Sequence, residues 1–82
     1  MSNTYTFNNL NFTNALLQNA DFMQDVEESI SDYMSHTADF VCKYCTTTNT
    51  LQVTFDTDLS VADLANLADC YAEILLMPQA YA

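Results

Sequence analysis

Four carboxylates in the first half of the chain recur at the spacing of one helical face. They are separated by four, three and four residues, so on an α-helix they fall within a sector of about 60°. Neighbouring carboxylates in such a line repel each other by about 0.2 to 0.5 kcal/mol per pair, and a cationic partner would relieve this cost. The spacing predicts either a surface for a basic partner or a solvated face that aids solubility. The four residues are Asp21, Asp25, Glu28 and Asp32.

The charge balance of the whole chain favours the first interpretation. Eleven Asp and Glu stand against one basic residue, Lys43, giving a formal net charge of -10. Only 15% of the residues are charged, against about 25% in ordinary domains, so the chain is depleted of Lys and Arg rather than rich in acid. Direct binding to DNA, RNA or an anionic membrane is incompatible with this charge. A basic protein surface is the expected partner.

Mimicry of a nucleic-acid backbone is the sharpest form of this hypothesis. Residues 21–32 of a helix span about 16 Å, or one charge per ~5.5 Å, against one phosphate per ~3.4 Å of a DNA strand. The line alone is therefore too sparse, and a mimic would need dimer symmetry or further carboxylates. Small size and one-signed charge fit phage-encoded anti-restriction or anti-CRISPR proteins by type rather than by motif. The further candidates are Glu27, Asp63, Asp69 and Glu73.

The cysteines suggest a metal site less strongly. Cys42 and Cys45 form a C-x-x-C, and His36 and Cys70 could complete a zinc site of three Cys and one His. However, the C-x-x-C lies in an alternating strand that sends its two thiols to opposite faces. Cys70 falls roughly 130° from the expected core stripe of its helix. We therefore predict reduced thiols that act as small hydrophobic side chains, and no metal.

A calcium loop is also disfavoured. Asp56, Asp58 and Ser60 match the first ligands of an EF-hand loop, but Val61 replaces its glycine and Leu67 its bidentate glutamate. Helix capping explains these residues better.

Catalytic groups are scarce. The chain has one His, one Lys, no Arg and no Gly, which leaves no phosphate-binding loop and no cationic oxyanion clamp. His36 could pair with Cys42 or Cys45 as a nucleophile, but a histidine at a helix C-terminus is more typical of a cap. We expect a non-enzymatic protein without a cofactor.

Composition predicts one folded domain over residues 1–82. Half of the residues are hydrophobic, with five Tyr and five Phe, which is too many for a disordered acidic tail. The N-terminal residues MSNTYTFNN have neither a basic start nor an apolar run, and no stretch approaches the ~20 apolar residues of a membrane span. We expect a cytoplasmic protein.

Alternation and periodicity define the elements of the first half. Residues 2–9 alternate weakly and predict a strand. A helix follows from about residue 12 to 36, and a break near Asn19 to Asp21, capped by either residue, would relieve the misplacement of Leu17 and Asn19. The apolar side, opposite the carboxylates, comprises Phe12, Leu16, Met23, Val26, Ile30 and Met34.

The second half predicts a β-hairpin over about residues 38–56 and a second helix from Val61 to Met77. Without glycine, Asn49 is the expected left-handed turn residue. Ser60 and Asp63 form a capping box, and Pro78 is expected to stop the helix. The expected wet side of this helix is Asp63, Asn66, Asp69 and Glu73, and its core stripe is Val61, Leu64, Ala65, Leu67, Ala68, Tyr71, Ala72 and Leu75.

Together these elements predict a small α+β domain of β-α-β-β-α order, with two helices on one face of a short three-stranded antiparallel or mixed sheet. The predicted function is that of an acidic inhibitor that docks on a basic nucleic-acid-binding protein. The alternative is a small homodimeric structural or assembly adaptor, joined through the open hairpin face or the Ile74 to Tyr81 end. The predicted partner-binding residues are Asp21, Asp25, Glu27, Glu28, Asp32, Asp63, Asp69 and Glu73.

Overall fold

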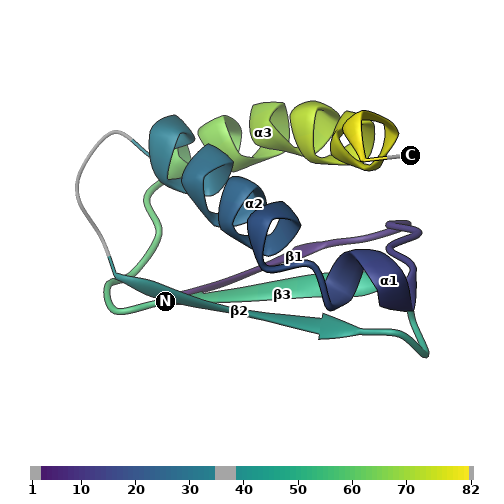
Figure 1. The fold of residues 1–82 in the computed structure, drawn as a ribbon. Coiled ribbons are helices and arrows are strands. Elements are labelled where there is room, and N and C mark those ends of the chain that lie inside the picture. The colour runs from purple at the N-terminus through teal and green to yellow at the C-terminus, as the bar shows by residue number, and fades with distance from the viewer. Residues whose placement is uncertain (1–2, 35–38, 82) are drawn as a thin grey trace.

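Two long helices lie side by side over one face of an antiparallel sheet (Figure 1). The structure is a computed structural model that describes residues 3–34 and 39–81. The element order confirms the predicted α+β fold, with one extra short helix before the first long one. The elements are β1 (Thr4–Phe7), α1 (Asn14–Leu17), α2 (Ala20–Tyr33), β2 (Phe40–Cys45), β3 (Thr50–Phe55) and α3 (Val61–Ala80).

The last strand of the sequence, β3, is the central strand of the sheet. It pairs antiparallel with β1, where Tyr5 is opposite Val53, and antiparallel with β2, where Cys42 is opposite the same Val53. The predicted hairpin is therefore present, and the sheet of the described residues is antiparallel throughout. Both β1 and β2 are edge strands.

The core lies between the sheet and the two long helices. Alternate residues of the strands point toward the helices, as period-two patterning predicts, while Lys43, Gln52 and Thr54 are exposed on the open face of the sheet. The fully or nearly fully buried side chains of the core include Phe7, Leu51, Val53 and Phe55 from the sheet, Phe22, Val26 and Ile30 from α2, and Leu67, Cys70 and Ile74 from α3.

Two asparagines take the left-handed conformations that this glycine-free chain requires. Asn49 has φ 55° in the hairpin turn, as predicted, and Asn9 has φ 59° after β1, which was not predicted. The backbone N–H of Leu10 donates to the Asn49 carbonyl at 2.9 Å, and the Tyr44 hydroxyl donates to the Leu10 carbonyl at 2.8 Å. The connection after β1 is thereby tied to the hairpin turn.

The predicted break in the first helix falls at Asn19. The Asn19 side chain accepts hydrogen bonds from the backbone N–H groups of Asp21 at 3.0 Å and Phe22 at 3.3 Å, so it caps α2. The new start places Phe22 in the core, a position that was not predicted. Helix α2 ends at Tyr33, and the predicted end near Ser35 or His36 lies outside the described residues.

The capping box at the start of α3 is confirmed. The Asp63 N–H donates to the Ser60 hydroxyl and the Ser60 N–H donates to the Asp63 carboxylate, each at 3.1 Å. The predicted stop at Pro78 is wrong, because α3 continues to Ala80. A proline in the last turn removes few hydrogen bonds, and this turn is held by the Tyr81 N–H, which donates to the Pro78 carbonyl at 3.1 Å.

The predicted core stripe of α3 is wrong at most positions, although Leu67 is fully buried and Tyr71 packs against the core, as predicted. Val61, Leu64 and Leu75 are 85%, 42% and 41% exposed, and Ala65, Ala68 and Ala72 are exposed as well. The helix packs through Leu67 together with Cys70 and Ile74, which lay outside the predicted stripe, and Asp63, predicted on the wet side, is only 2% exposed. Both faces of α3 carry apolar side chains, so periodicity alone does not distinguish the face that packs. Burial of Asp63 is tolerated because its carboxylate is paired in the capping box.

Candidate functional site: an acidic face across two helices

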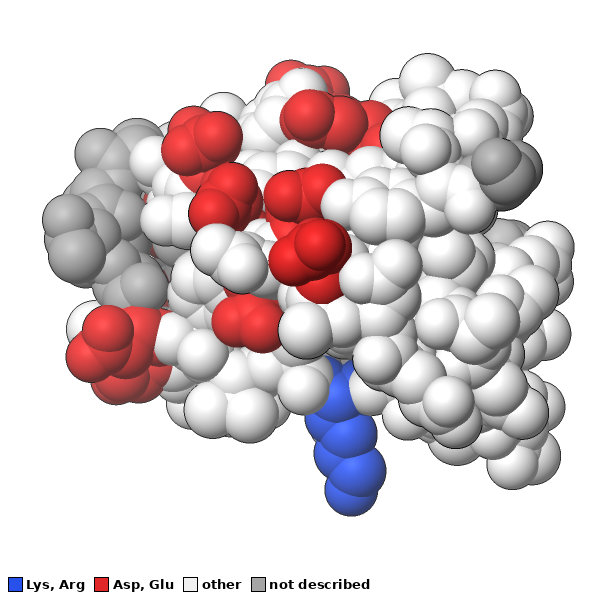
Figure 2. All heavy atoms as spheres, viewed as in Figure 1, with Lys and Arg blue, Asp and Glu red and all other residues white. Residues whose placement is uncertain are grey.

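Carboxylates gather over α2 and the adjoining side of α3 (Figure 2). We call the following set the acidic face: Asp21, Asp25, Glu28 and Asp32 from α2 and Glu73 from α3, all exposed. Lys43, the only Lys or Arg in the chain, lies on β2 among residues of the open sheet face. This cation therefore lies away from the carboxylates of the acidic face.

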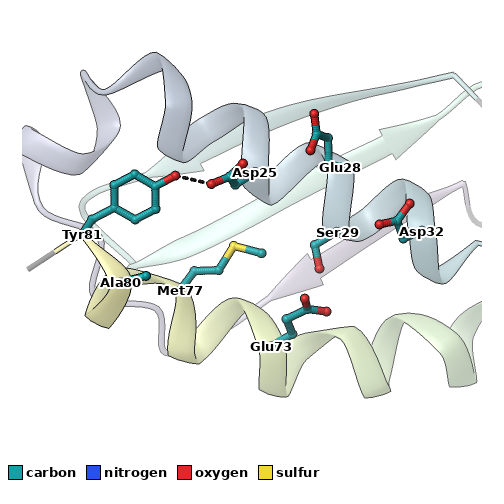
Figure 3. Close-up of a pocket in the computed structure, with 8 residues that line it drawn as sticks. All are labelled: Asp25, Glu28, Ser29, Asp32, Glu73, Met77, Ala80 and Tyr81. Carbon is teal, nitrogen blue, oxygen red and sulfur yellow. Dashed lines mark hydrogen bonds between the residues drawn. The ribbon is translucent and has the colours of Figure 1, made fainter.

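Close packing of small side chains brings the two helices together beneath the acidic face. The Ser29 hydroxyl of α2 lies 3.6 Å from the Cys70 thiol of α3, and both are buried. Beside this contact is a pocket of about 290 Å³, into which the Glu73 side chain points from α3 toward Ser29 (Figure 3). The pocket is lined by Asp25, Glu28, Ser29, Asp32, Glu73, Met77, Ala80 and Tyr81.

Tyrosine hydroxyls supply neutral donors to this face. The Tyr81 hydroxyl donates to the Asp25 carboxylate. That hydrogen bond, together with burial and the nearby charges of Asp25, Asp21 and Glu28, raises the pKa of Tyr81 to about 12. At the end of α2, hydrogen bonding to Glu73 raises the pKa of Tyr33. Because a neutral hydroxyl brings no positive charge, the negative charge of the face is not neutralised.

Sequence patterning did not reveal either tyrosine. Tyr81 is 56 residues from Asp25, and it follows a proline that was expected to end the helix. The only available signal was its place at the apolar end of α3. Its ring packs edge-on against Phe22, with centroids 5.3 Å apart, so the same residue closes the core and reaches the acidic face.

The structure does not bring all the predicted partner-binding residues together. Asp63 is buried in the capping box and is unavailable to a partner. Glu27 lies on the other flank of α2, where its charge acts on Cys42 of β2. Asp69 is exposed on α3 and its charge acts on Tyr33, so it extends the acidic face without lining the pocket.

A second, smaller group of acids lies at one end of the β2–β3 pair, with Asp39 directly before β2 and Asp56 directly after β3. The Asp56 N–H donates to the Asp39 carbonyl at 3.0 Å, and both side chains are exposed. These residues place negative charge outside the acidic face, so they provide matched control positions for charge-removing substitutions.

The three thiols differ in environment and are all free. Cys70 is buried, which contradicts its expected position away from the core, and burial raises its pKa. Burial, with a smaller effect of Glu27, raises the pKa of Cys42 to about 12. Cys45 is exposed, and hydrogen bonds from Thr48 and Thr47 lower its pKa. Of the four candidate zinc ligands, His36 lies outside the described residues.

Within residues 3–34 and 39–81, no group of three or more His, Cys, Asp or Glu is placed to hold a metal ion. None of the helices in this part of the chain combines the length and hydrophobicity that a membrane span requires. Comparisons with profiles of known protein families, with curated protein sequences and with solved structures find no match to this chain.

Proposed function

We propose that the acidic face docks on the basic, nucleic-acid-binding surface of another protein in the cytoplasm and inhibits it. The observation that carries this proposal is the meeting of Glu73 of α3 with the carboxylate line of α2 in one pocket. Two helices far apart in sequence contribute the same charge to one surface, although mutual repulsion opposes such an arrangement. By type, this inhibitor would be a DNA mimic like the phage proteins that block restriction or CRISPR nucleases.

Charge density supports mimicry better on the assembled face than on one helix. With Glu73 added, five carboxylates share a length of about 16 Å, or roughly one charge per 4 Å. The corresponding spacing along one DNA strand is about 3.4 Å per phosphate. Because these carboxylates lie on two helices, the duplex with both strands counted, at about 1.7 Å per phosphate, is also a relevant comparison, and the acidic face is sparser than the duplex but denser than α2 alone.

The electrostatics also favour a partner over solubility alone. Solubility requires net charge, but it does not require the removal of nearly every cation. A face with no Lys or Arg of its own projects an unneutralised field, which speeds encounter with a basic surface and weakens as salt screens it.

The test is recovery of the partner with the tagged full chain, followed by measurement of its affinity at about 50 and 500 mM salt. We expect the recovered protein to bind nucleic acid, to be displaced from the chain by a DNA duplex, and to lose at least tenfold in affinity at high salt. The test variant carries Asp21→Asn, Asp25→Asn, Glu28→Gln and Asp32→Asn and should lose at least a hundredfold.

A control variant with the same net charge changes four carboxylates outside the acidic face. It carries Glu27→Gln, Asp39→Asn, Asp56→Asn and Asp58→Asn and should bind within about threefold of the wild type at equal salt. Equal losses in the two variants would assign the effect to net charge alone, and salt-independent binding would exclude electrostatic docking.

A further inference from the structure

Tyr81 places a hydrogen-bond donor of the chain itself on the acidic face. Its hydroxyl donates to the carboxylate of Asp25 (Figure 3), which lies between Asp21 and Glu28 in the carboxylate line of α2. A basic partner that engages the face at this point must supply a donor to the same carboxylate. In the free chain, that position is already occupied by the phenol.

Tyr81 also contributes to the walls of two cavities. One is the pocket of the acidic face, with a volume of about 290 Å³. The other has a volume of about 280 Å³ and lies between α3 and the segment that contains α1. Displacement of this one residue therefore changes the shape of both cavities. The second cavity is lined by Asn11, Thr13, Ala15, Leu16, Pro78 and Tyr81.

The turn of α3 that carries Tyr81 is weakly tied to the rest of the helix. We call residues 78–81 the α3 strap. Pro78 has no backbone N–H, so one hydrogen bond to the preceding turn is missing. Tyr81 leaves the helical conformation, with φ -111° and ψ 4°, and its N–H donates to the Pro78 carbonyl at 3.1 Å. A helix end with few backbone hydrogen bonds opens at a low cost in free energy.

Two side-chain contacts of Tyr81 hold the α3 strap against α2. The Tyr81 ring packs edge-on against Phe22, with centroids 5.3 Å apart, and Phe22 is fully buried. The second contact is the hydrogen bond from the hydroxyl to Asp25, which joins a neutral donor to a charged acceptor. A cationic donor forms a stronger hydrogen bond with a carboxylate than a neutral donor does. A cation at this position therefore competes with the phenol for Asp25.

We propose that a cationic side chain of the basic partner displaces the Tyr81 hydroxyl from Asp25 and thereby releases the α3 strap. This inference rests on the proposed function, and it makes the closed strap an autoinhibitory contact of the acidic face. Release of the strap withdraws the Tyr81 ring from Phe22, so an apolar surface is uncovered beside the carboxylates. An apolar centre with a polar rim is the usual composition of a protein interface.

The closed strap sets a specific cost on docking. A partner binds Asp25 only in molecules whose strap is open, so the measured affinity is lowered in proportion to the fraction of open molecules. The Tyr81 hydroxyl is the part of the strap that competes directly with the cation. Removing that hydroxyl while keeping the ring should therefore strengthen binding, whereas removing a hydroxyl elsewhere should not.

Binding of a hexa-arginine peptide to the full chain at about 50 mM salt, followed by nuclear magnetic resonance of the Tyr81 ring, tests the proposal. We expect the ring resonances to move toward those of an unpacked tyrosine as the peptide saturates the acidic face. Tyr81→Phe should bind the peptide about three- to tenfold more tightly than the wild type. Tyr71→Phe is the matched control, because the Tyr71 hydroxyl donates to the Asn8 carbonyl outside the acidic face. It should bind within about twofold of the wild type.

A Tyr81 ring that stays packed while the peptide saturates the acidic face would overturn the proposal. Equal affinities of the wild type and Tyr81→Phe would also overturn it, as would equal gains in the two variants. A peptide that fails to bind at low salt has the same meaning, because Asp25 then attracts no cation. Docking of the natural partner is measured separately, by its recovery and its salt dependence, so the acidic face can remain the docking surface when the strap proposal fails.

Discussion

The hydroxyl of Tyr81, the residue that caps α3, donates a hydrogen bond to the carboxylate of Asp25 in the middle of α2. This contact joins the end of the chain to the acidic face while the Tyr81 ring packs against Phe22 in the core. The protonation state of one phenol is thus coupled to the packing of the two long helices.

Alkaline titration should reveal this coupling. The pKa of Tyr81 is raised to about 12 from its ordinary value of 10.0, so the unfolded chain loses this proton first as the pH rises. The protonated Tyr81 should therefore contribute fully to the free energy of unfolding below about pH 10, and this contribution should be lost between about pH 10 and 12. Tyrosinate absorbance should continue to rise in the same range.

The variant Asp25→Asn separates this effect from general alkaline unfolding. It replaces the carboxylate that accepts the Tyr81 hydrogen bond, and whose charge disfavours tyrosinate, with a neutral amide, so the pKa of Tyr81 should shift back toward its ordinary value. The same substitution at Asp56, in the second acidic group, should leave the titration unchanged. Superimposable curves for the wild type and Asp25→Asn would show that Asp25 does not control Tyr81.

Two leucines of α3 that sequence patterning places together should differ in stability. Leu67 is fully buried, whereas Leu64 is 42% exposed. Leu67→Ala should lower the free energy of unfolding by about 2 to 5 kcal/mol because it leaves a cavity in the core. Leu64→Ala should change it by less than about 1 kcal/mol. Urea denaturation at dilute protein concentration measures both, and similar losses would contradict the observed orientation of α3.

Thiol labelling of the native protein should single out Cys45. It is exposed and its pKa is lowered by hydrogen bonds from Thr48 and Thr47, whereas burial raises the pKa of Cys42 and Cys70. Because the thiolate is the reactive form, an aromatic disulfide reagent at neutral pH should modify one thiol rapidly. Cys45→Ser should abolish that fast phase and Cys42→Ser should preserve it. In urea all three thiols should react, and a fast phase that survives in Cys45→Ser would refute the assignment.

The sequence was most informative where a local pattern had a single structural solution. Alternation across residues 40–45 and 50–55 predicted the hairpin because only one register buries Leu51, Val53 and Phe55 together. Asn19 marked the helix break because its side chain caps the new start. These features depend on neighbours in sequence, so they could be predicted without knowledge of the tertiary fold.

The orientation of α3 could not be predicted in the same way. Its exposed and buried sides both carry apolar side chains, so periodicity alone favoured Val61 and Leu64 over Cys70. The decision rests on Ser29 of α2, which is small enough to admit Cys70, and on the capping box, which allows Asp63 to be buried. The candidate site was incomplete for the same reason, because Glu73 and Tyr81 join it only after α3 is oriented.

The single cation of the chain also has a structural consequence. Lys43 lies between Val41 and Cys45 on the outward side of β2, and β2 is an edge strand of the sheet. An edge strand offers unpaired backbone groups to the strands of other molecules, and a lysine there disfavours such pairing because its charge would have to be desolvated. Lys43 is the only lysine or arginine of the chain, and its position on β2 disfavours fibril-like pairing at this edge of the sheet.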